Sequence, residues 1–195
     1  ALEEEFAAYT GAKYAVGLNS GLDALTLSVA ALGIGAGDEV IVPANTYIAT
    51  VLAVTGNRAT PVFVEPDEYY NLDTSKLEAA ITERTRAIMP VHLYGQAVDM
   101  PAVMAVAKAH HLAVIEDCAQ SHGAHFGDVM TGRFGDVGCF SFYPTKNLGA
   151  FGDAGAIVTD DAALAERIRM LRNYGSKEKY HNELCGINSR LDEIQ

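Results

Sequence analysis

The sequence has few cysteines and no long apolar run, and each scarcity excludes a class of protein. Cys118, Cys139 and Cys185 are an odd number of cysteines at wide spacing, which indicates neither a disulfide framework nor a CxxC motif. No apolar stretch approaches membrane-spanning length, and no charged-then-apolar leader opens the chain. We therefore expect no membrane partner and a cytoplasmic setting.

Basic residues are also scarce. The chain has 14 Lys and Arg against 25 Asp and Glu, for a formal net charge of −11. Such a balance disfavours binding to nucleic acid or to anionic membranes. The 195 residues are 49% hydrophobic and 20% charged, which is ordinary for one large globular α/β domain.

A metal site has little support. Cys118, His122 and His125 are close in sequence and could in principle bind zinc, but their spacing matches no common ligand pattern. A buried, apolar cysteine is the better interpretation of Cys118, and we predict no metal.

Short β-branched runs alternate with helix-length amphipathic stretches, which predicts a three-layer α/β/α fold with a mostly parallel seven-stranded sheet. The expected strands are Ala15–Leu18, Glu39–Val42, Thr60–Val64, Ala87–Val91, Ala113–Glu116, Val137–Phe142 and Ala156–Thr159. The expected helices are Leu2–Tyr9, Leu22–Leu32, Ile48–Thr55, Lys76–Ala80, Pro101–His110, Ala162–Leu171 and one beginning at Arg190. Ser75 and Glu78 fit a capping box at the start of the Lys76–Ala80 helix.

The glycines Gly33, Gly35 and Gly37 resemble a dinucleotide-binding loop. They follow a helix and precede a strand, however, which is the reverse of the order that this loop requires. A helix C-cap and turn is the preferred interpretation.

Ligands bind beyond the carboxyl ends of the strands in open parallel sheets, and four segments there carry candidate site residues. The first places Lys146 just after the apolar strand that ends near Ser141, ahead of a glycine-rich stretch. A lysine in a loop is usually only solvated. Ser141 could nevertheless bind a phosphate, and a desolvated lysine amine can form an imine with an aldehyde cofactor.

The second segment ends a buried strand with Asp117. An unpaired buried carboxylate is costly, and a protonated pyridine nitrogen would serve as its partner. Helix N-capping by Asp117 is the alternative.

The third segment leads through Ser20 and Gly21 into a helix, whose free amides could bind a phosphate or could simply be capped. In the fourth, Tyr47 follows another strand end and could stack on a flat heterocycle, although core packing is the commoner fate of such a tyrosine.

At these residues the sequence resembles the fold-type-I pyridoxal 5'-phosphate (PLP) enzymes, and among them the DegT/StrS-type nucleotide-sugar aminotransferases. The resemblance extends over essentially the whole chain. The matching segments are Asn19–Leu25, Gly37–Pro43, Pro43–Thr50, Pro90–Gly95, Glu116–Gln120, Ser141 with Lys146, and Gly186–Glu193.

The resemblance implies a role for each of these residues. Lys146 would form the imine with PLP and move protons, Asp117 would pair with the pyridine nitrogen, and Gln120 would lie near the phenolic oxygen. Tyr47 would stack on the ring. Ser20, Gly21, Leu22 and Ser141 would bind the phosphate, and Asn188 would reach the phosphate of a neighbouring subunit, which implies a homodimer with shared active sites.

Leu22 is a departure, because many relatives have a threonine there. Together with His122 and the segment around His181, it resembles the subgroup that aminates C3 of dTDP-linked 3-keto-6-deoxyhexoses. His122, Tyr180 and His181 are the substrate-side candidates, although His181 could equally be an exposed loop residue. The implied amino donor is glutamate.

Two other functions stay open at this point. The first is a sugar dehydratase of the same fold, although such relatives typically have histidine at the position of Lys146. The second is a non-catalytic regulatory relative. Both ends of the chain look cut, so we expect residues 1–175 to form the PLP-binding large domain of an N-terminal fragment. Residues 176–195 would begin the connection to an absent C-terminal small domain.

Overall fold

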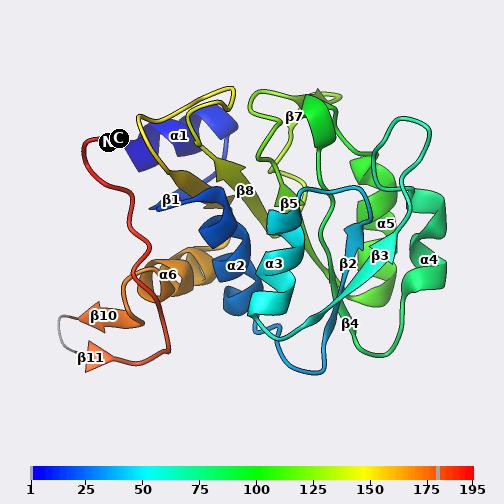
Figure 1. Ribbon diagram of the computed structural model, residues 1–195, viewed down its shortest axis with the longest axis horizontal. Helices are drawn as coiled ribbons and strands as arrows, with labels where there is room; N and C mark the ends of the chain where they lie inside the picture. Colours follow the sequence, from blue (N-terminus) through cyan, green and yellow to red (C-terminus); the bar gives the residue numbers. More distant parts are fainter. Residues whose placement is uncertain (1, 179–180) are drawn as a thin grey trace.

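A computed structural model describes residues 2–178 and 181–195 and contains one mixed seven-stranded sheet (Figure 1). The strands in spatial order are β1 (Tyr14–Leu18), β9 (Gly155–Thr159), β8 (Val137–Ser141), β5 (Ala113–Asp117), β4 (Thr85–Ile88), β2 (Glu39–Pro43) and β3 (Thr60–Val64). Only β9 runs antiparallel to its neighbours in this sheet, and the other adjacent pairs are parallel. The prediction of a mostly parallel seven-stranded sheet is confirmed.

Helices cover both faces of the sheet. They are α1 (Leu2–Thr10), α2 (Gly21–Ala31), α3 (Ile48–Gly56), α4 (Leu77–Ala80), α5 (Met100–His110) and α6 (Ala162–Leu171). Two short 3₁₀ helices lie at Thr74–Lys76 and Leu93–Gly95, and two small hairpins are β6–β7 (His125–Phe126 and Val129–Met130) and β10–β11 (Ser176–Glu178 and His181–Asn182). Within residues 2–178 and 181–195, no helix has both the length and the apolar character needed to span a bilayer.

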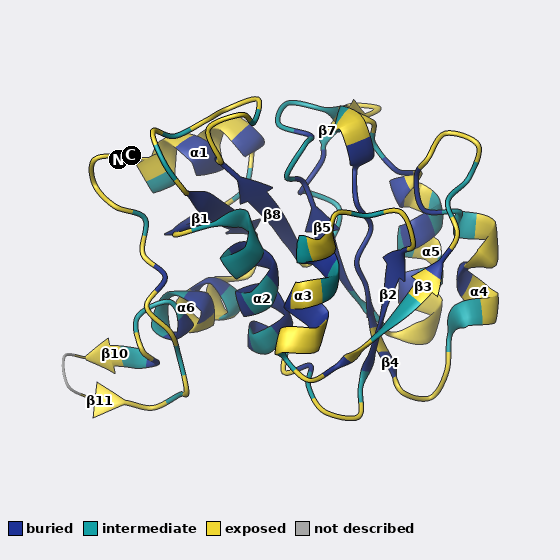
Figure 2. Ribbon diagram, in the orientation of Figure 1, coloured by how far each residue is buried: buried dark blue, intermediate teal, exposed yellow. Residues whose placement is uncertain are grey.

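Successive side chains along each strand point to opposite faces of the sheet, and both faces are covered by helices, which gives three layers. In β2, Val40 and Val42 pack into the core under α2, α3 and α6, while Ile41 points into the core under α4 and α5. All three side chains are fully buried, and each such burial stabilises the fold by about 1.5–3 kcal/mol. Figure 2 shows the central strands as buried and the outer helix surfaces as exposed. The predicted α/β/α layering is therefore confirmed.

Most element boundaries agree with the sequence-based expectation to within two residues, but two local predictions are wrong. The Ser75–Glu78 capping box does not form, because Asp73 caps this turn and accepts hydrogen bonds from both the amide and the hydroxyl of Ser75. No helix begins at Arg190 in the described residues, and the chain ends in an extended segment with a single turn.

The glycine segment after α2 is a helix end and turn, as predicted. Gly33 and Gly37 adopt φ angles of 75° and 94°, in the left-handed region that glycine enters at low cost. The chain then enters β2 directly.

Candidate active site

Four parallel strands deliver the candidate residues to one edge of the sheet. β1 ends just before Ser20, β2 just before Tyr47, β5 at Asp117 and β8 five residues before Lys146. Residues Leu18 and Ser141 both pair with Gly155 of the intervening strand β9, so the ends of β1 and β8 flank one point. The shared edge expected from the sequence is confirmed.

Asp117 is the buried acid of this edge, with 5% of its surface exposed. Its Oδ2 accepts a hydrogen bond of 2.9 Å from the Thr50 hydroxyl, and its Oδ1 accepts one of 3.1 Å from the Ala119 amide. Burial raises the pKa of Asp117, while these hydrogen bonds and the positive charge of Lys146 act in the opposite direction. A cationic ligand group would stabilise this carboxylate. The helix N-cap alternative is wrong, because Asp117 caps a turn that no helix follows.

Lys146 lies in the turn after β8, where its amide donates a 2.8 Å hydrogen bond to the carbonyl of Tyr143. Its side chain is half-buried. Burial has the larger effect on both neighbours, raising the pKa of Asp117 and lowering that of His122. The positive charge of Lys146 acts to lower the pKa of each. The lysine therefore lies within electrostatic reach of the buried acid.

The start of α2 has the geometry expected of an anion site. Ser20 is the N-cap of this helix, and its hydroxyl accepts a 3.0 Å hydrogen bond from the Asp23 amide. A Cβ atom on Gly21 would lie 2.6 Å from the Cβ of Ser141, so the helix start approaches Ser141 as closely as glycine allows. Helix N-terminal amides beside a hydroxyl are a natural site for phosphate. Leu22 follows in the same first turn and packs against the core.

Gln120 is held in a defined orientation. Its Oε1 accepts a 2.7 Å hydrogen bond from the backbone amide of Tyr94, a residue with a left-handed φ of 58°. Because the oxygen of the Gln120 amide is engaged, the nitrogen is the end left to donate to a ligand oxygen. This geometry suits the phenolic oxygen that the sequence resemblance implied.

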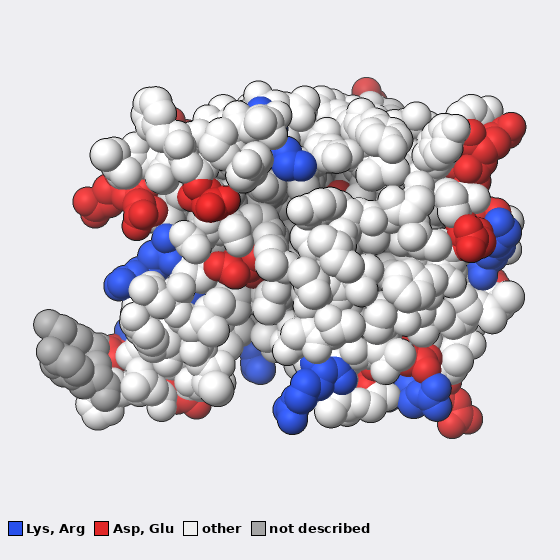
Figure 3. Space-filling view, in the orientation of Figure 1, with Lys and Arg blue, Asp and Glu red and all other residues white. Residues whose placement is uncertain are grey.

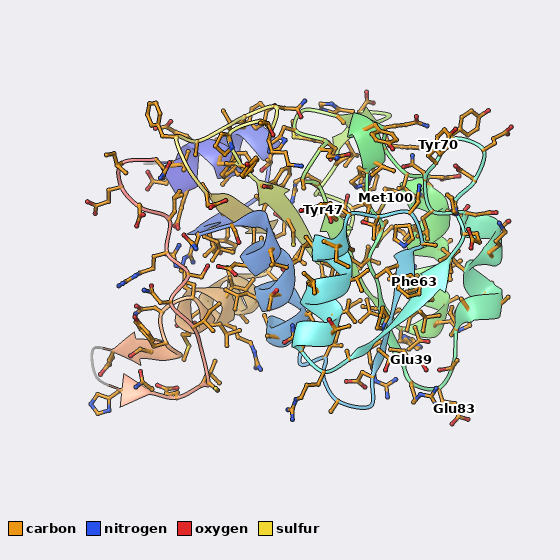
Figure 4. The ribbon with its side chains drawn as sticks, in the orientation of Figure 1. Glu39, Tyr47, Phe63, Tyr70, Glu83 and Met100 are labelled. Atoms are coloured by element: carbon orange, nitrogen blue, oxygen red, sulfur yellow. The ribbon has the colours of Figure 1, made fainter. Side chains whose placement is uncertain are left out.

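Tyr47 is the N-cap residue of α3 and is 73% exposed. Figure 4 shows it at the start of that helix. The alternative that Tyr47 packs in the core is wrong, because most of its surface is exposed to solvent.

His122 follows Asp117 by five residues and packs against the rings of Phe140 and Phe142. Both of its ring nitrogens are buried and make no hydrogen bond with the described residues. Burial lowers the pKa of His122, which favours the uncharged ring. It borders a cavity of about 410 Å³ that is lined by Leu2, Glu5, Phe6, Tyr9, His122, Asn147 and Leu148.

The Cys118, His122 and His125 set does not form a cluster. Among the described residues, one group of potential metal ligands is His92, Glu116 and Cys118, all buried. Their polar atoms already serve the fold: Glu116 accepts from His92 Nε2 and from the amides of Gly132, Phe134 and Gly135. Cys118 is fully buried, as expected, and burial raises its pKa well above the ordinary value.

The remaining candidates lie towards the end of the chain. Asn188 is exposed, and its Oδ1 accepts a 3.1 Å hydrogen bond from Arg190 Nε. His181 is exposed at the start of β11, which agrees with the exposed-residue alternative. Tyr180 lies outside the described residues.

Two residues at this edge were not predicted. Thr50 binds Asp117, and Ser189 is fully buried beside the start of α2. The Ser189 hydroxyl donates to Asp23 Oδ2 at 2.6 Å and accepts from the Asn19 amide at 3.2 Å. Both residues lie in segments that carried the family resemblance, but their partners are distant in sequence.

The site thus combines a half-buried lysine, a buried acid and a helix start beside Ser141 at the carboxyl edge of an α/β sheet. The family model of the DegT/DnrJ/EryC1/StrS aminotransferases matches residues 1–195. The chain belongs to this family.

Individual relatives are similar over nearly the whole chain. A dTDP-3-amino-3,6-dideoxy-alpha-D-galactopyranose transaminase from Aneurinibacillus thermoaerophilus is 60% identical over 99% of the chain and 53% of the relative. The solved structure of DesV from S. venezuelae, in complex with a ketimine intermediate, has a TM-score of 0.97 at 58% identity and covers 99% of this chain and 52% of that one. NtdA from Bacillus subtilis, solved with bound cofactor PMP, has a TM-score of 0.95 at 36% identity and covers 99% and 44%. The chain spans about half the length of the curated relatives that it matches.

Proposed function

We propose that this chain is the PLP-binding part of an aminotransferase that moves an amino group from an amino acid to a nucleotide-linked keto-sugar. The observation that carries the proposal is the meeting of Lys146, Asp117 and the α2 anion site at one sheet edge. The family match and the sugar transaminases among the relatives support it.

The residues of the edge fit PLP group by group. The buried Asp117 carboxylate suits the protonated pyridine nitrogen, and the Gln120 amide nitrogen is free to donate to the phenolic oxygen. The start of α2, with Ser20, Gly21 and Ser141, suits the phosphate. Tyr47 can cover the ring, and Leu22 contributes only its backbone amide.

The cofactor, when bound, supplies an electron sink for the carbon that loses or gains a proton. The protein supplies the rest. Lys146 would hold the cofactor aldehyde through its amine, and the same amine would be the group that takes up and gives back the proton. Asp117 would keep the pyridine nitrogen protonated, and His122 is a proposed substrate contact.

We propose a dTDP-linked 3-keto-6-deoxyhexose as the acceptor and glutamate as the donor. The name of the A. thermoaerophilus relative supports a dTDP-sugar aminated at C3, and Leu22, His122, Tyr180 and His181 carry the subgroup resemblance. His122, Tyr180 and His181 are the proposed substrate contacts.

We further propose a cytoplasmic homodimer with shared active sites, in which Asn188 reaches the phosphate bound by the partner subunit. Figure 3 shows a face with few charged side chains over α3, β2 and β3. Tyr47 and Phe63 are 73% and 54% exposed there (Figure 4). An apolar face of this kind is typical of a protein interface. Residues 1–175 would form the large domain, and residues 176–195 would lead to a small domain.

Trapping the lysine–cofactor bond tests this function. The protein is incubated with PLP, reduced with borohydride and digested, and the pyridoxyl-modified peptides are mapped by mass spectrometry. We expect one adduct, on Lys146. The control variant Lys76→Ala removes an exposed lysine that is paired with Asp73 and should leave the adduct unchanged.

The variant Lys146→Ala should lose the adduct and, in a protein of the relatives' full length, should lose amine transfer by about a thousandfold or more, because no other group takes over covalent and proton-transfer chemistry. Retained transfer in this variant, or an adduct spread over many lysines, would contradict the proposed function.

A further inference from the structure

The carboxylate of Asp117 is held by a side chain from a different layer of the fold. Thr50 lies in the first turn of α3, is fully buried, and donates from Oγ1 to Asp117 Oδ2 at 2.9 Å. A second hydroxyl, that of Thr46, lies 2.7 Å from Thr50 Oγ1. The three groups form a short chain that leads from the loop after β2 to the end of β5.

The direction of the hydrogen bonds in this chain follows from its last member. An ionised carboxylate can only accept, so the Thr50 hydrogen must point to Asp117, and the Thr46 hydroxyl must donate to Thr50. Consecutive hydrogen bonds with the same direction polarise and strengthen one another. The arrangement therefore favours the ionised form of Asp117.

The same contacts fix the rotation of the carboxylate. Thr50 occupies one side of Oδ2, and the amide of Ala119 occupies one side of Oδ1 at 3.1 Å. Each carboxylate oxygen has about two acceptor positions, so each oxygen keeps one for a ligand. α3 also begins at Tyr47, and a single helix therefore places both the candidate stacking ring and the group that holds the acid.

We propose that Thr50 is a positioning residue for the reaction, and that it orients and stabilises the Asp117 carboxylate against the pyridine nitrogen of PLP through the Thr46–Thr50–Asp117 chain. This inference rests on the proposed function. Burial raises the pKa of Asp117 and so favours its protonated form. The Thr46–Thr50–Asp117 hydrogen bonds oppose this effect, because a carboxylate without them at this depth would become protonated and lose its attraction for a cation.

Thr50→Val tests the inference, because valine keeps the shape of threonine and removes only the hydroxyl. In a protein of the relatives' full length we expect PLP to bind about tenfold more weakly and kcat to fall about tenfold, in line with the loss of a hydrogen bond to a charged group. KM for the keto-sugar should be unchanged. The visible absorption band of bound PLP should shift at neutral pH, as it should in Asp117→Asn.

Three variants separate positioning from simple stabilisation of the fold. Thr50→Ser keeps the hydroxyl and should restore PLP affinity, spectrum and kcat. Thr46→Val should act in the same direction as Thr50→Val but more weakly. Thr55→Val, on the same helix, removes an exposed hydroxyl that contacts only the carbonyl of Leu52 and should behave as wild type. Thermal unfolding of each cofactor-free variant shows whether the fold is retained.

The outcomes are distinct. A wild-type protein without a PLP adduct on Lys146 would overturn the proposed function and the inference together. A wild-type adduct and a strong effect of Asp117→Asn, with Thr50→Val equal to wild type, would overturn the inference alone. A Thr50→Val defect that Thr50→Ser fails to correct would also overturn it, because the hydroxyl would not be the cause.

Discussion

Among the residues of the edge, Asp117 illustrates how a site residue can cost stability. Burial raises its pKa in the folded chain, so between the unfolded and folded pKa values the folded state binds more protons than the unfolded state. The free energy of unfolding therefore falls as the pH rises through that interval. A cost of this kind is consistent with the chemical role proposed for Asp117.

Asp117→Asn should consequently stabilise the cofactor-free protein at pH 7, since it removes the buried charge and keeps the shape of the side chain. The gain should shrink as the pH falls towards about 4, the pKa of an unfolded aspartate. Urea unfolding of the wild type and of Asp117→Asn between about pH 4 and pH 7 measures this difference in the free energy of unfolding. Asp128→Asn, at an exposed position, is the matched control. Equal stability of wild type and Asp117→Asn at pH 7 would contradict the argument.

At the scale of elements, the anion site depends on how closely the start of α2 approaches the end of β8. A methyl group on Gly21 would lie 2.6 Å from the Cβ of Ser141, closer than such atoms come in folded proteins, and 3.1 Å from its Cα. The helix start or the strand end would have to move. The proposed phosphate site is therefore an arrangement of two elements as well as a set of donors.

Gly21→Ala should weaken PLP binding about tenfold or more, because the helix amides and Ser141 would no longer converge. Gly56→Ala is the matched control: it lies at the end of α3 with no atom within 4 Å of the added methyl group, and it should leave PLP affinity unchanged. Fluorescence titration of both variants with PLP makes the comparison. Similar affinities in the two variants would show that the close approach is unimportant.

At the scale of the whole molecule, the proposed assembly makes a prediction that one subunit alone cannot satisfy. Each shared site would take Lys146 from one subunit and Asn188 from the other. Asn188 is exposed and its side-chain oxygen accepts a hydrogen bond from Arg190, so its amide nitrogen can be offered to a partner.

Mixing inactive Lys146→Ala with impaired Asn188→Ala, after unfolding and refolding together, should restore activity, because half of the mixed dimers' sites receive both native residues. Random pairing gives a recovery of about one quarter of the wild-type value. Each variant refolded alone is the control, and sedimentation confirms the dimer. Recovery no greater than the mean of the two variants would argue against shared sites.

The sequence by itself determined the layers of the fold and the edge that holds the site. Strand-and-helix alternation is a local property, and parallel strands bring their carboxyl ends together whatever the details of packing. Lys146, Asp117, Ser20 and Tyr47 could therefore be placed from their positions after strands.

Tertiary structure alone decided how these groups are held. Thr50 donates a hydrogen bond to Asp117, 67 residues away in sequence. The Tyr94 amide orients the Gln120 side chain, which is 26 residues away. Glu116 accepts hydrogen bonds from three loop amides and from His92, which together form one buried cluster. Hydrogen bonds between distant segments leave no periodic trace in the sequence, because they depend on which side chains meet after the layers have packed.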